Sequence, residues 1–122
     1  MVLVDTSVWV AHLRAGDAEL ANLLNDAEVA CHPFVIGELA CGNLKNRREI
    51  LSLLQVLPIV TIAEHDEVML FIENHKLMGR GIGYVDVHLL TSAALTGLTI
   101  WTFDKKLDEV AVEFGLDFKA AL

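Results

Sequence analysis

Cysteine, proline and long apolar runs are scarce in this chain of 122 residues. Its 2 cysteines, Cys31 and Cys41, have neither CxxC spacing nor a histidine at zinc-ligand spacing, so we interpret both as buried free thiols. With 2 prolines, 8 glycines and no stretch dominated by one residue type, the chain is not of the disordered or low-complexity class. No apolar run reaches the roughly 18 residues of a membrane span, and no basic segment precedes the first apolar residues. We therefore expect a cytoplasmic protein without a membrane partner.

Basic residues are also few, with 9 Lys and Arg against 17 Asp and Glu and a net charge of −8. This balance argues against binding nucleic acid through bulk charge. It does not exclude an enzyme that acts on nucleic acid, because metal ions can hold clustered acids and a local basic patch can steer a phosphate backbone. A hydrophobic content of 54% over 122 residues predicts a single domain spanning 1–122.

Short apolar segments alternate with amphipathic ones along the whole chain, which indicates strands alternating with helices. Such alternation predicts an α/β fold with helices on both faces of a mainly parallel sheet of four or five strands, a three-layer α/β/α arrangement. Strands are expected at 2–4, 28–32, 58–62 and 98–103, with an edge strand at 116–119. Helices are expected at 7–13, 17–27, 33–44, 46–57, 64–78, 84–97 and 104–115.

The first ten residues, MVLVDTSVWV, place a carboxylate inside an apolar run. A buried carboxylate is costly without a partner, so Asp5 must have one elsewhere in the chain or in a ligand. Asp104 also follows a predicted strand, and Asp86 begins a predicted helix. Each could be a helix N-cap alone. Because the carboxyl ends of parallel strands share one edge of a sheet, we expect the three to lie together.

Glu38 is a fourth candidate, since it is the only charged residue in PFVIGELACG and lies too far inside that segment to cap it. On its own it could be a surface glutamate. Two carboxylates about 4 Å apart repel by roughly 4 kcal/mol at an effective dielectric of about 20, so a cation is expected among the four. Oxygen ligands favour Mg²⁺ or Mn²⁺, and an acidic site with such ions suits phosphoryl transfer.

Four segments occur in the order found in one known family: MVLVDTSVWV, FVIGELACG, IGYVDVHLLTSAALTG and WTFDKKL. On these segments the chain resembles PIN-domain ribonucleases, and specifically VapC-type toxins. The resemblance implies a Mg²⁺-dependent endoribonuclease, with Mn²⁺ as a substitute ion, that forms a homodimer and is silenced by a VapB-like antitoxin. It places the acidic site on Asp5, Glu38, Asp86 and Asp104. The family's hydroxyl corresponds to Thr6, with Ser7 beside it. Either hydroxyl could orient a metal-bound water or a phosphate, and the alternative for both is a purely structural role in a local turn or cap.

One position departs from the family pattern, because Phe103 stands where a basic residue often precedes the last aspartate. Contacts to RNA must then come from other basic residues, although each could be only a solvated surface charge. We interpret the five histidines as non-ligands and both tryptophans as core residues, and Asp108 as an accessory acid or a surface residue. The basic candidates are Arg14, Lys45, Arg47, Arg48, Arg80, Lys105 and Lys106.

Three alternatives fit some of these features. A receiver-type phospho-acceptor domain would need paired acids after the first strand and an aspartate after the third, and neither is present. A haloacid-dehalogenase-like phosphatase would need a second aspartate where Ser7 stands. A PIN-like binding module without activity is disfavoured because all four acids are present.

Overall fold

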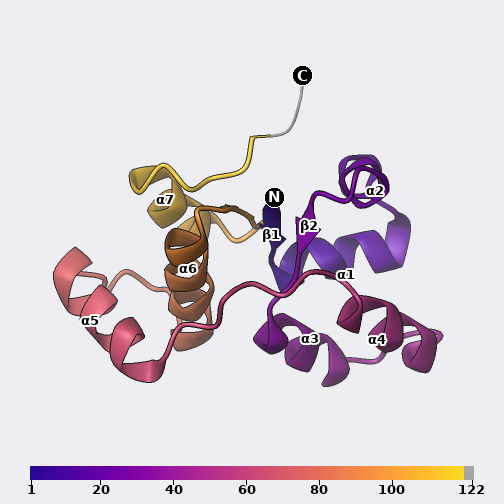
Figure 1. Ribbon diagram of the computed structural model, residues 1–122, viewed down its shortest axis with the longest axis horizontal. Helices are drawn as coiled ribbons and strands as arrows, with labels where there is room; N and C mark the ends of the chain where they lie inside the picture. Colours follow the sequence, from indigo (N-terminus) through magenta and orange to yellow (C-terminus); the bar gives the residue numbers. More distant parts are fainter. Residues whose placement is uncertain (120–122) are drawn as a thin grey trace.

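The computed structural model describes residues 1–119, and within them three strands and seven helices alternate as the sequence predicts. Figure 1 shows α1 to α4 on one side of the short strands and α5 to α7 on the other. The strands are β1 (Val2–Val4), β2 (Val29–Ala30) and β3 (Thr99–Trp101). The helices are α1 (Thr6–Ala15), α2 (Ala18–Asn25), α3 (Pro33–Ala40), α4 (Arg47–Gln55), α5 (His65–His75), α6 (Tyr84–Thr96) and α7 (Lys105–Glu113).

The sheet is parallel, with β1 between β2 and β3. Leu3 is level with Ala30 on one side and with Ile100 on the other. The backbone N–H of Asp5 donates to the carbonyl of Trp101 at 2.9 Å, which continues the β1–β3 pairing one residue past the strand. Residues that follow β1 and β3 are therefore brought to the same edge of the sheet.

The predicted strands at 58–62 and 116–119 are wrong as full strands. Each forms one isolated parallel bridge, Cys31 with Ile59 and Ile100 with Asp117, which adds a single pairing to each edge of the sheet. The ladder beside β2 cannot continue, because the chain turns into α3 at Pro33, directly after His32. The outer segments pair over only a few residues and supply no further ladder.

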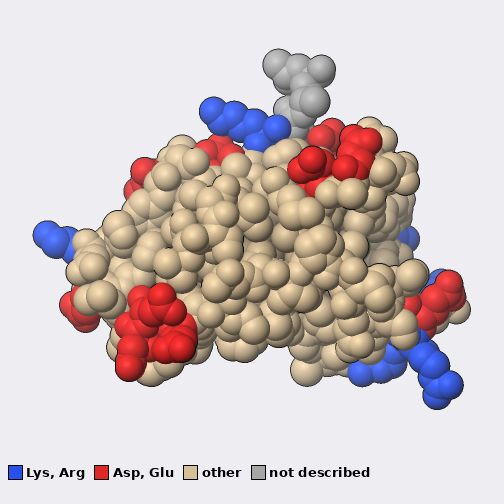
Figure 2. All heavy atoms as spheres, in the orientation of Figure 1, with Lys and Arg blue, Asp and Glu red and all other residues tan. Residues whose placement is uncertain are grey.

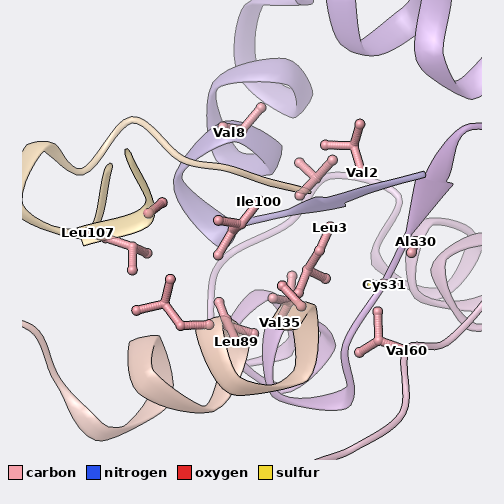
Figure 3. Close-up of a cluster of buried hydrophobic side chains, with 14 of the residues drawn as sticks. Val2, Leu3, Val8, Ala30, Cys31, Val35, Val60, Leu89, Ile100 and Leu107 are labelled. Carbon is pink, nitrogen blue, oxygen red and sulfur yellow. The ribbon is translucent and has the colours of Figure 1, made fainter. Parts of the chain in front are cut away.

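The core lies between the sheet and the helices, and Figure 3 shows Leu3, Ile100, Leu89 and Leu107 within it. All four are fully buried. Helix α6 is the most enclosed, since every residue from 87 to 93 is buried. This packing fixes the helix whose first turn carries Asp86.

The two cysteines lie in different surroundings. Cys31 is buried as predicted, and burial raises the pKa of its thiol to about 11, so it stays protonated and unreactive near neutral pH. Cys41 is free but exposed at the end of α3, so the prediction of burial was wrong there. In the described part of the chain, no helix has the length and apolarity needed to cross a membrane.

Candidate active site

Asp5 lies at the junction between β1 and α1 and is only 6% exposed. It stands at the N-cap position, yet its side chain makes no capping hydrogen bond. Its Oδ2 instead accepts hydrogen bonds from two hydroxyls, Ser7 Oγ at 2.8 Å and Thr102 Oγ1 at 2.7 Å. The carboxylate is thus held toward the end of β3, and capping does not account for it.

Thr102 and Ser7 connect the ends of β1 and β3. Thr102 Oγ1 also accepts from the backbone N–H of Asp104 at 3.0 Å, and Ser7 Oγ accepts from the N–H of Phe103 at 3.0 Å. Thr102 was missed in the sequence, although a hydroxyl two residues before a strand-end aspartate was a usable signal. These bonds fix Asp5 and Asp104 relative to each other.

Asp104 serves as the N-cap of α7. Its Oδ1 accepts from the backbone N–H groups of Lys106 at 2.9 Å and Leu107 at 3.0 Å. The capping role considered from the sequence is therefore real. It occupies one oxygen and leaves Oδ2 without a hydrogen bond from residues 1–119.

Glu38 extends from α3 and is exposed. Thr6, the first residue of α1, donates from Oγ1 to Glu38 Oε1 at 2.7 Å. This contact joins residues 32 positions apart in the sequence and brings Glu38 to the end of β1, as predicted. Glu38 also lines a groove of about 500 Å³ between α1, α3 and the segment that leads into α4.

Asp86 lies in the first turn of α6, where its Oδ2 accepts from the backbone N–H of Gly83 at 3.1 Å. Partial burial raises its pKa above the usual range, and the negative charges of Asp5, Asp104 and Glu38 raise it further, while the Gly83 hydrogen bond lowers it. The charge of Asp86 is therefore destabilised by its three predicted partners. Asp5, Glu38 and Asp104 therefore lie within electrostatic range of Asp86, and the four residues are called the acid site below.

The acid site has the donor chemistry of a hard cation site. Among residues 1–119, hydrogen bonds reach one oxygen of each acid and leave the other oxygen free. Neither ion pair found in that part of the chain includes one of the four acids. No three His, Cys, Asp or Glu side chains among those residues are arranged to hold a metal ion as they stand. Mg²⁺ or Mn²⁺ would fit the oxygen donors once the side chains converge.

The basic candidates are dispersed, and two of them, Arg80 and Lys106, contact residues of other segments. Figure 2 shows basic residues at the lower right, over α4, and a mostly uncharged central face. Arg80 forms a bidentate pair with Glu113 at 2.8 and 3.0 Å. The Lys106 side chain lies against Gly81, so closely that a Cβ on Gly81 would be 2.7 Å from Lys106 Cδ. These contacts join the loop before α6 to α7.

Comparison with known proteins identifies the family. The family model for the PIN domain matches residues 2–113. The chain belongs to the PIN-domain family. It is 50% identical over 117 residues to Ribonuclease VapC32 of Mycobacterium tuberculosis, covering 95% of this chain and 94% of that protein. The predicted resemblance to VapC-type PIN-domain proteins is thus confirmed.

Solved structures support the same PIN fold. A toxin-antitoxin complex from Klebsiella pneumoniae gives a TM-score of 0.66 at 20% identity and covers 87% of this chain and 88% of that one. Mycobacterium tuberculosis VapC20, described as a Sarcin-Ricin loop cleaving toxin, gives 0.63 at 21% identity, with 90% and 95% covered. The predicted α/β class is confirmed, and membership of the PIN family disfavours the receiver and phosphatase alternatives.

Proposed function

We propose that this chain is a Mg²⁺-dependent endoribonuclease toxin of a toxin-antitoxin pair, with Asp5, Glu38, Asp86 and Asp104 holding the ion. The observation that supports the proposal is that Asp5, Asp104 and Glu38 lie near enough to Asp86 for their charges to raise its pKa. Among residues 1–119, each of the four acids also has one carboxylate oxygen that accepts no hydrogen bond. The 50% identity to Ribonuclease VapC32 supports RNA as the substrate and a nuclease as the enzyme class.

The residues of the chain have separate tasks in this proposal. Thr102 and Ser7 hold Asp5 at a fixed angle through two hydroxyl bonds, and Thr6 orients Glu38. Mg²⁺, when bound, would neutralise the acids and favour attack of water on an RNA phosphodiester. Asp86 contributes most to the need for a cation, because its pKa is raised and its charge is poorly compensated in the metal-free protein.

The antitoxin is proposed to bind in the groove that Glu38 lines. Val10, Leu13 and Ile50 supply apolar contacts there, and Glu38 supplies a carboxylate for a basic side chain of the partner. A toxin-antitoxin complex among the structural neighbours supports a partner of this kind. A homodimer is also proposed, and the exposed apolar side chains at the end of α4, with Val56 79% exposed, offer surface for it.

The test of this function is mapping of cleavage sites across total RNA with the wild-type protein and Asp86→Asn, each with Mg²⁺ and with EDTA. We expect defined cleavage sites only for the wild type in Mg²⁺. Asp66→Asn is the matched control, since Asp66 is an exposed acid in the first turn of another helix, α5. Equal cleavage by Asp86→Asn, or cleavage by the wild type in EDTA, would contradict the proposal.

A further inference from the structure

The loop between α5 and α6, residues 76–83 and called the strap here, leads directly into the turn that carries Asp86. Its last residue, Gly83, donates its backbone N–H to Asp86 Oδ2 at 3.1 Å. Gly83 also accepts a hydrogen bond from the N–H of Val87 at 3.1 Å, at the start of α6. Among residues 1–119, Asp86 accepts no other hydrogen bond, so the direction of its carboxylate depends on where the strap places Gly83.

The strap is bound to α7 by an ion pair near the C-terminal end of that helix. Arg80 donates to both carboxylate oxygens of Glu113, at 2.8 and 3.0 Å. The hydrogen bonds and charge of Glu113 raise the pKa of Arg80, and the charge of Glu109 on the same helix raises it further. The guanidinium is therefore engaged by α7, the helix that Asp104 caps.

Lys106 crosses the strap at Gly81, one residue after Arg80. A Cβ built on Gly81 would be 2.7 Å from Lys106 Cδ and 2.8 Å from Nζ, so any side chain at that position would have to displace Lys106. Gly81 has a φ of +80° and Gly79 a similar φ of +72°, a conformation that favours glycine. Nothing lies within 4 Å of a Cβ built on Gly79, so the close approach distinguishes Gly81 from its neighbour.

Helix α7 is a firm support for these two contacts. Lys106 and Glu113 are seven residues apart, which places them on the same face of the helix, two turns from each other. Leu107 is fully buried in the core, and the N–H of Lys106 donates to Asp104 Oδ1 at 2.9 Å. At the other end, Phe114 packs on His75, the last residue of α5, with ring centroids 4.7 Å apart. The strap therefore links the position of Asp86 to the helix that Asp104 caps.

We propose that Arg80 and Lys106 are positioning residues, which hold the strap on α7 and thereby set the place of Asp86 relative to Asp104. This inference rests on the proposed function, because it takes the acid site as the site of the ion. In this role neither basic side chain contacts the ion or the substrate. Both were candidates for contacts with RNA, and the contacts within the chain give them a different task.

The first experiment breaks the ion pair from each side, with Arg80→Met and with Glu113→Gln. Two quantities are measured without RNA: the hydrogen-exchange rate of the Gly83 amide in metal-free protein, by NMR, and the affinity for Mg²⁺, by calorimetry. Both variants should speed the exchange and weaken Mg²⁺ binding by about 2- to 5-fold, the range for one exposed ion pair. Glu28→Gln is the matched control, since it removes an ion pair with the N-terminus and should change neither quantity.

The contact at Gly81 is tested with a pair of glycine variants. Gly81→Ala and Gly79→Ala impose comparable backbone strain, but only Gly81→Ala displaces Lys106. We expect Gly81→Ala to weaken Mg²⁺ binding by about 10-fold, and Gly79→Ala to weaken it less. Combining Gly81→Ala with Lys106→Ala should cost less than the sum of the two separate losses, because the overlap disappears with the lysine side chain. Strict additivity, or equal losses for the two glycine variants, would contradict the contact's role.

Direct contact of Arg80 with RNA would give a different pattern. Arg80→Met would then weaken binding of a labelled single-stranded oligoribonucleotide in EDTA, whereas Glu113→Gln, which releases the same guanidinium, would strengthen it. Mg²⁺ affinity would change in neither variant. That pattern would overturn the inference, as would exchange of the Gly83 amide at the wild-type rate in both variants, or faster exchange with unchanged Mg²⁺ affinity.

The proposed function and the positioning role can fail separately. A wild-type protein that binds no Mg²⁺ would contradict the proposed function, while faster Gly83 exchange in Arg80→Met and Glu113→Gln would still support the hold of the strap on the start of α6. Mg²⁺ binding and RNA cleavage by the wild type, with Gly83 exchange unaltered in both variants, would remove the positioning role and leave the proposed function in place.

Discussion

The acids that follow strands and the acids carried inside helices are held in different ways. Asp5 and Asp104 lie within one network of hydroxyl and backbone donors centred on Thr102. Within residues 1–119, Glu38 and Asp86 each accept a single hydrogen bond, from Thr6 and from Gly83. The strand-end pair is therefore preorganised, while the helix-borne pair retains freedom to move toward a cation and carries more of the uncompensated charge.

Stability and function are in conflict at Asp86 but not at Asp5. Hydrogen bonds to Asp5 stabilise the metal-free fold as well as the site, because Asp5 and Thr102 are both buried. The negative charge of Asp86 does the opposite, since burial and its three acidic neighbours raise its pKa.

Removing a hydroxyl that positions an acid should lower activity more for the strand-end pair than for the helix-borne pair. We expect Thr102→Val to lower kcat/KM for RNA cleavage by about 10- to 100-fold, because it removes one hydrogen bond from each of Asp5 and Asp104. Thr6→Val should cost less than about 10-fold, since it releases only Glu38 and the contact is exposed. Thr96→Val, which removes a hydroxyl that bonds only within α6, is the control. A larger loss for Thr6→Val than for Thr102→Val would reverse the proposed ranking.

Neutralising one acid of each pair should change stability in opposite directions. In urea unfolding with EDTA present, Asp5→Asn should lower the free energy of unfolding by about 1–3 kcal/mol, because charge-assisted bonds from Ser7 and Thr102 are weakened. Asp86→Asn should raise it, because an amide oxygen still accepts from Gly83 while the repulsion is removed. The same sign for both variants would show that the two pairs are not held differently.

The stability of the metal-free protein should depend on pH through Asp86. Its pKa in the folded state lies above its ordinary value near 3.8. Between these two pKa values, the folded state therefore binds more protons than the unfolded state does. Stability from this group is therefore greatest below pH 3.8 and falls as pH rises through the raised pKa. The stability gained by Asp86→Asn over the wild type should grow across this window and then level off. A gain that is constant from pH 3 to about pH 7 would exclude this cause.

Much of the arrangement followed from the sequence for physical reasons. Strand-end acids could be predicted to meet, because parallel strands place their carboxyl ends on one edge. Thr102 was harder to identify, because threonine is an ordinary residue within the strand predicted at 98–103, and the structure places it just after β3. The outer strands at 58–62 and 116–119 failed because apolar alternation cannot show how long a neighbouring segment stays in register. Exposure of Phe103 depends on which ring packs against Trp101, a contact that spacing does not reveal.

Calorimetric titration of Mg²⁺ into the metal-free protein is the decisive test of a metal site at the four acids. We expect saturable binding to the wild type and to Asp66→Asn, and loss of binding in Asp5→Asn and Asp86→Asn. Saturating Mg²⁺ should also raise the unfolding temperature of the wild type but not that of Asp86→Asn. Mg²⁺ binding of equal strength in the wild type and Asp86→Asn, or no binding to the wild type, would contradict a metal site built from these four acids.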